Sequence, residues 1–228
     1  MRFLFAAALL LLVLPGTASA QVCESLLHDG QAVYAGYAYD SHDRGYAYGP
    51  RGTIHFENGL GVSGRYNVIV LDGVEVKAQE FGATVHFQRR VGNRAAWCGG
   101  AGVHRGWLHG YEQTDWGPLM WGGDPPQPTR IEQRAYALPM SVGGGLDLVR
   151  ETERRLILFA EITRTERYLR VERFTVQEVR RESHSNHEWS GSLGALGAIG
   201  PVVVSPRLVR VYAPETHTAL GLSVGMHF

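Results

Sequence analysis

The chain has 228 residues and carries 22 basic and 22 acidic side chains. This balance excludes the strong positive field by which proteins recruit nucleic acid, so we expect no nucleic-acid partner. The length suits a single domain with a full core and is too short for two.

The amino end has the organisation of a secretory signal peptide. Arg2 gives the basic start, an apolar run covers 3–14, and 18–20 form an A-x-A cleavage site. The apolar run is shorter than the roughly 20 residues that a spanning helix needs. We therefore expect 1–20 to be a cleaved signal peptide and 21–228 to be the mature domain.

Most of the mature chain alternates in character every two residues, which is typical of β-strands. It lacks the run of about 18 apolar residues that a membrane helix would need, so a membrane location would require a barrel. The expected strands, in chain order, are 31–39, 53–56, 60–70, 79–90, 95–103, 134–148, 156–163, 168–179, 189–204, 207–212 and 218–228.

Turn-forming and polar residues separate these strands. Asn58-Gly59 predicts a tight hairpin, and 40–52 is expected to be a loop. The tryptophan- and proline-rich stretch 106–130 predicts a long surface loop, and 180–188 a polar one. Ser205-Pro206 predicts a short turn.

The last eleven residues, TALGLSVGMHF, place large apolar side chains on one face and small or polar ones on the other. The apolar face consists of Leu220, Leu222, Val224, Met226 and Phe228. This segment resembles the terminal strand of bacterial outer-membrane β-barrels, which the barrel-assembly machinery recognises. It departs from that pattern at Met226, where an aromatic residue is usual, and at Ser223, where glycine is usual. The resemblance implies that the five apolar residues form the assembly signal.

The segment 192–213, SLGALGAIGPVVVSPRLVRVYA, together with the terminal strand resembles the last hairpins of small outer-membrane barrel domains of the OmpA/OmpX-like kind. That resemblance implies an all-β fold: a closed antiparallel up-and-down transmembrane barrel with eight strands, located in the outer membrane. Its partners would be outer-membrane lipid and, during biogenesis, the barrel-assembly machinery. Side chains just fill an eight-stranded interior, so we expect a structural or surface-loop interaction role and not a wide solute pore.

Two cysteines, Cys23 and Cys98, accompany the export signal. An oxidising compartment permits them to pair, and theirs is the one possible bridge. The sequence leaves open whether they do.

The histidines are candidates for a catalytic or metal site. His55, His86 and His227 fall at alternating strand positions, where a lumen-facing role is expected, and His104 and His109 suggest an interfacial girdle.

The cluster 183–188 contains the materials of an activated nucleophile, a serine beside a histidine with an acidic neighbour. Lipid A deacylases space this pair as His-x-Ser, whereas His184 and Ser185 are adjacent and would point to opposite faces of a strand. We therefore expect no enzyme, no catalytic residue, no metal and no cofactor. Two alternatives stay open: a lipid A-modifying outer-membrane hydrolase, and a secreted soluble lipocalin-like barrel with its apolar face inward.

Overall fold

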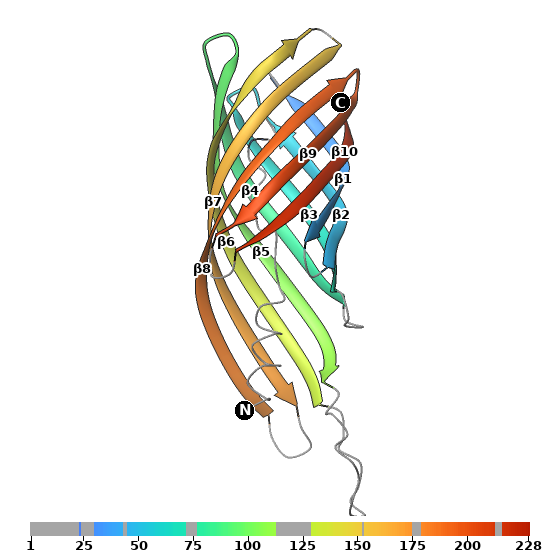
Figure 1. Cartoon of the computed structure of the whole chain (residues 1–228), viewed down its shortest axis with the longest axis vertical. Helices are drawn as coiled ribbons and strands as arrows, with labels where there is room; N and C mark the ends of the chain where they lie inside the picture. Colours follow the sequence, from blue (N-terminus) through green and yellow to red (C-terminus); the bar gives the residue numbers. More distant parts are fainter. Residues whose placement is uncertain are drawn as a thin grey trace, which may run out of the picture.

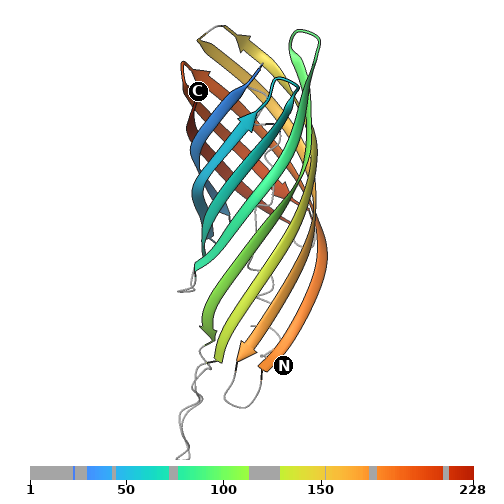
Figure 2. The ribbon, with the colours of Figure 1, turned by 180° about the vertical axis from the view of Figure 1, so that it is seen from behind.

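The structure, a computed structural model, describes Cys23 and residues 30–42, 45–71, 77–112, 129–151, 153–174, 179–212 and 216–228. These ranges contain ten strands: β1 (Ala32–His42), β2 (Gly45–His55), β3 (Leu60–Leu71), β4 (Lys77–Val91), β5 (Ala95–Glu112), β6 (Thr129–Arg150), β7 (Arg154–Phe174), β8 (Val179–Ile199), β9 (Val202–Val211) and β10 (His217–His227). Each strand pairs antiparallel with the next, and β10 pairs with β1 to close a barrel (Figures 1 and 2). In the same ranges, no helix has the length and apolar character needed to cross a membrane.

The expected architecture of a closed antiparallel barrel is confirmed, but the expected number of eight strands is wrong. The number eight followed from the resemblance to OmpA/OmpX-like domains. Two segments that were interpreted as loops also belong to strands: residues 40–42 complete β1, 45–52 form most of β2, and 180–188 form the distal half of β8. The latter segment is polar on both faces, so its sequence lacks the alternation that marks a strand. Backbone pairing with β7 continues along it from Phe174↔Val179.

Three prolines lie inside strands, where a proline cannot donate to the ladder. Pro50 pairs with Tyr37 on β1, but the β2–β3 register skips from Tyr48 to Arg51. Pro206 likewise pairs with Leu222 on β10 and falls in a gap of the β8–β9 register. Pro139 pairs with Thr165 on β7 and falls in a gap of the β5–β6 register. Each of these three prolines in the described ranges thus turns its missing N–H toward one neighbour only. Ser205-Pro206, expected to be a turn, therefore lies within β9.

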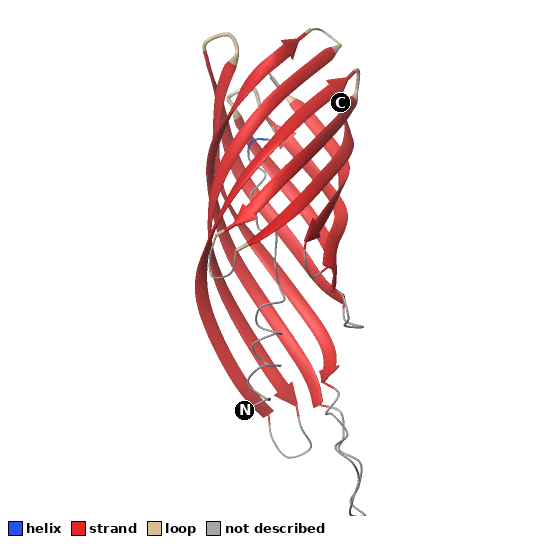
Figure 3. Ribbon diagram, viewed as in Figure 1, coloured by secondary structure: helices blue, strands red, loops and turns tan. Residues whose placement is uncertain are grey.

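Four consecutive strands are much longer than the rest. Strands β5 to β8 have 18 to 22 residues, whereas β1, β2, β3, β9 and β10 have 10 to 12. Strand β8 pairs with β9 only from Ser190 onward, so its distal half has its described neighbour on the β7 side. The excess length projects from one end of the barrel as a four-stranded sheet (Figures 1 and 3). We call residues 109–112, 129–137, 165–174 and 179–189 the sheet extension.

The two faces of the barrel wall differ in the sense expected of a membrane protein. Large apolar side chains point outward and are exposed, including Leu220 at 63% and Val142 at 60%. Polar and charged side chains point inward and are buried, including Glu80, Glu161 and Arg207. A soluble lipocalin-like barrel would have the opposite arrangement, so the structure excludes that alternative.

Candidate functional site: the barrel lumen and the sheet extension

The lumen contains ion pairs that join strands of the wall. Arg207 on β9 donates to Asp40 on β1 at 2.5 Å, although β10 lies between these two strands. Both side chains are almost wholly buried. Burial of charge in this way is tolerated because each group has an opposite partner.

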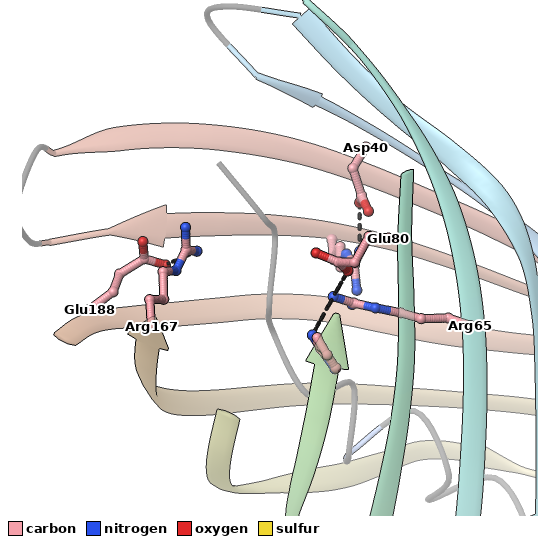
Figure 4. A network of polar contacts seen from close by, with 7 residues as sticks. Asp40, Arg65, Glu80, Arg167 and Glu188 are labelled. Carbon is pink, nitrogen blue, oxygen red and sulfur yellow. Dashed lines mark hydrogen bonds and ion pairs between the residues drawn. The ribbon is translucent and has the colours of Figure 1, made fainter. Parts of the chain in front are cut away.

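A second group of charges lies on β3, β4 and β5. Arg65 donates to Glu80 at 2.7 Å, and one of its nitrogens lies 3.0 Å from His104 Nδ1. Arg167 on β7 donates to Glu188 on β8 at 3.0 Å. Figure 4 shows the Arg65–Glu80 and Arg167–Glu188 pairs within the barrel interior. His104 was expected in an outer girdle, but it faces the lumen and is 2% exposed.

Near the end of the barrel with the tight turns, Asp147 on β6 is shared by two arginines. Arg90 contacts it at 2.9 Å and Arg155 at 3.1 Å. Because Arg90 is on β4 and Arg155 on β7, one carboxylate joins three strands of the wall. A single charge that is shared in this way holds more of the barrel than a simple pair would.

Two of the histidines expected to face the lumen lie together there. The rings of His55 and His86 are stacked with centroids 6.0 Å apart, and both residues are buried. His55 contacts Gln88, and His86 Nδ1 lies 3.3 Å from the Ser63 hydroxyl. These contacts agree with hydrogen-bonding lumen residues and involve no carboxylate orienter.

Cys23 and Cys98 are joined by a disulfide inside the barrel, with Cα atoms 5.4 Å apart. Both residues are 0% exposed. The backbone N–H of Cys23 donates to Glu161 Oε2 at 3.3 Å, and a Cβ at Gly143 would collide with the Cys23 sulfur. A residue from before the first strand is thereby fixed against β5, β6 and β7.

The described lumen is thus occupied by charged and polar side chains. In addition to the ion pairs, Arg51 on β2 reaches past β1 to contact Ser223 on β10 and donates to the Tyr34 hydroxyl at 3.2 Å. Such a filling stabilises the wall from within. Chemically, the arrangement suits a closed scaffold better than an open water-filled channel.

The cluster 183–188 is not the loop that its sequence indicated. On β8, His184 shares the inward side with Glu182 and Glu188, whereas Ser185 is on the outward side with Trp189. His184 Nε2 lies 3.8 Å from Glu182 Oε2. Throughout the described ranges, no three His, Cys, Asp or Glu side chains gather as a metal site.

The outer face of the sheet extension and its base carry a pattern of aromatic residues and arginines that the sequence analysis did not identify. Aromatic residues Tyr136, Tyr168 and Trp189 are exposed there next to exposed arginines. The Arg105 guanidinium lies 5.6 Å from the Tyr136 ring centroid, and that of Arg164 lies 5.8 Å from the Trp189 ring. The sequence predicted strands over 134–148 and 168–179, but it could not show that Tyr136 and Tyr168 lie opposite one another, because that depends on the register of β6 and β7.

Comparison with solved structures supports the fold. The translocator domain of the autotransporter NalP from Neisseria meningitidis matches with a TM-score of 0.57 and 11% identity, over 88% of this chain and 89% of that one. Ail of Yersinia pestis matches with a TM-score of 0.37 and 11% identity, over 88% and 100% of the two chains. No family model matches the sequence, and no curated protein does. The chain therefore has the fold of outer-membrane β-barrels.

The expectation that the protein is not an enzyme needs correction. The outer-membrane protease OmpT of Escherichia coli is also a structural match, with a TM-score of 0.45 and 9% identity, over 87% of this chain and 94% of that one. Barrels of this general architecture thus include an enzyme, so the fold gives no ground for excluding catalysis. At that similarity the match carries no argument about which chemistry this chain performs.

Proposed function

We propose that the protein is exported by its signal peptide, resides in the outer membrane and displays the sheet extension at the cell surface as an interaction platform. The observation that carries this proposal is the combination of a lumen joined by buried ion pairs with four strands that extend beyond the others. The barrel then serves as the anchor, and the extension serves as the contact surface.

The lengths of the connections support this orientation. At the end opposite the extension the turns are tight, and Gly92 and Gly200 adopt φ values of 71° and 56° within two of them. At the extension end, the connection between β5 and β6 covers 113–128. Outer-membrane barrels have short periplasmic turns and longer extracellular loops. The extension therefore belongs on the extracellular side.

Cysteine labelling on intact cells tests the orientation. Ser185→Cys places a thiol on the outer face of β8, and Asn93→Cys places a matched one in the β4–β5 turn. A membrane-impermeant maleimide should label the first variant on whole cells and the second only after the outer membrane is permeabilised. The reverse pattern, or recovery of the protein in the soluble periplasmic fraction, would contradict the proposal.

Planar-bilayer recording tests the closed lumen. The wild-type barrel should give conductance far below that of a sixteen-stranded porin, because side chains occupy its interior. The Arg65→Ala/Glu80→Ala variant, which removes both partners of a lumen pair, should conduct more. Porin-like steps from the wild-type protein would show that it is a channel.

A further inference from the structure

The outward face of β6 and β7 contains two directly opposed arginines. In the register of these strands Arg134 is opposite Arg170, and Tyr136 is opposite Tyr168 in the next outward-facing row. Like charges directly opposite one another destabilise a sheet. The arginine pair therefore has a cost that its surroundings have to offset.

The opposite face of the extension shows how the protein offsets such a cost. There Arg173 and Arg180 are also directly opposed, and the carboxylate of Glu182 contacts both, at 3.2 and 3.1 Å. One anion is shared between two guanidinium groups. The inner pair therefore shows how one anion can bridge two directly opposed arginines, and the outer pair can be compared with it.

The outer pair is arranged differently. Arg170 contacts Glu172 of its own strand at 2.7 Å, and Arg134 lies 3.9 Å from Glu132 of its own strand. The arginine side chains remain 53% and 55% exposed. Since a guanidinium has five N–H donors, each retains capacity to bind an external anion placed between them.

The charge on this face favours an anion. Its arginines contact all three of its glutamates, and arginines outnumber glutamates: Arg105, Arg130, Arg134, Arg164, Arg170 and Arg181 against Glu132, Glu166 and Glu172. Nearer the tight-turn end, β6 presents Leu138, Met140 and Val142 outward, all exposed. A ligand that matches both zones has an anionic head and long apolar chains.

We propose that Arg105, Arg134 and Arg170 bind a phosphate of lipid A, the phosphorylated glycolipid of the outer leaflet. Tyr136 and Tyr168 lie at the head-group level, and the acyl chains follow Leu138, Met140 and Val142 along β6. The phosphate takes the bridging place that Glu182 takes on the inner face. This inference rests on the proposed outward orientation of the extension.

Binding of lipid A to the purified, detergent-folded full chain tests the inference. We expect Arg134→Gln/Arg170→Gln to weaken binding about tenfold or more, because two charge-assisted contacts are lost. The matched control Arg173→Gln/Arg180→Gln removes the same charge from the inner face and should stay within about twofold of wild type, given that its contacts are to Glu182. Lipid A with both phosphates removed should bind wild type as weakly as bisphosphorylated lipid A binds the outer-face variant.

Three outcomes would overturn the proposal: equal binding of the dephosphorylated lipid, equal loss in both double variants, or inorganic phosphate competing as well as lipid A itself. The last would indicate a free-phosphate site. A failure here is distinct from a failure of the surface platform, which the Ser185→Cys labelling tests without reference to these arginines. If lipid A binds as expected but the labelling pattern is reversed, the arginine site is supported and the proposed orientation of the sheet extension is wrong.

Discussion

Arg207 on β9 and Asp40 on β1 meet across the intervening strand β10 directly in front of Gly221. A Cβ built on Gly221 would collide with the Arg207 guanidinium and with Asp40 Oδ1. A side chain at that place on β10 would therefore force Arg207 or Asp40 to shift. Glycine at position 221 leaves the space in which these two distant charges meet.

Gly221→Ala is expected to destabilise the barrel, because the methyl group pushes Arg207 and Asp40 apart and disrupts a buried ion pair. Breaking a buried pair costs about 3 to 5 kcal/mol. Urea unfolding in detergent would measure the loss. Gly64→Ala is the control, since nothing lies within 4 Å of a Cβ there. Equal stability of the two variants would disprove the role given to Gly221.

Asp147→Asn should cost far more than Glu166→Gln. Asp147 is buried and shared by Arg90 and Arg155, so losing its charge disrupts two ion pairs at once, at about 3 to 5 kcal/mol. Glu166 pairs with a half-exposed Arg164, a contact worth about 1 kcal/mol or less. The same urea titration compares the two variants. Similar midpoints would show that Asp147 contributes no more to stability than Glu166 does.

Phe228→Ala should lower the amount of folded protein in outer membranes more than it lowers stability. Phe228 is 74% exposed on the outward face, and its backbone N–H donates to the Val33 carbonyl at 2.9 Å, a bond that the variant keeps. The control is Phe81→Ala, which removes the same side chain from an outward position on β4. Membrane yield in cells and refolding in detergent are compared. Equal yields would argue against a special role of the terminal residue in assembly.

Cys98→Ser should reduce the free energy of unfolding by about 4.5 kcal/mol, the chain-entropy value for a bridge that closes a loop of this length. The sequence separation of the two cysteines is 75. Unfolding of Cys23→Ser/Cys98→Ser serves as the control, because it also removes the unpaired thiol left in the single variant. If both variants unfold at the wild-type urea concentration, the bridge contributes nothing to stability.

The sequence was informative where a strand has one apolar face that points out of the barrel. In the terminal strand, Leu222 and Val224 lie outward and Ser223 inward, as alternation indicated. It failed beyond the apolar belt, where both faces of β8 are polar and 180–188 was interpreted as a loop. There the backbone pairing of a long neighbour maintains the strand, which no local pattern reports. Part of the stretch expected as a long loop, 113–128, lies outside the described residues.

In the candidate sites, too, local alternation predicted some positions, and others depend on how the strands pair. Lumen positions of His55 and His86 followed from periodicity, but the position of Asp40 beside Arg207 depends on β1 and β10 closing the barrel. Opposition of Arg134 and Arg170 depends on the register of β6 and β7. Register is a property of strand pairs. A single sequence without contacts therefore could not reveal either site.

The enclosed position of the Cys23–Cys98 bridge has a consequence for the order of biogenesis. Once β1 pairs with β10, a folded oxidoreductase has no access to sulfur atoms that are 0% exposed within the wall. Oxidation by such an enzyme must therefore come while the sheet is still open, before β1 pairs with β10; on the export route that we propose, this takes place in the periplasm. The disulfide in the finished barrel would then be a bond that formed before the barrel closed.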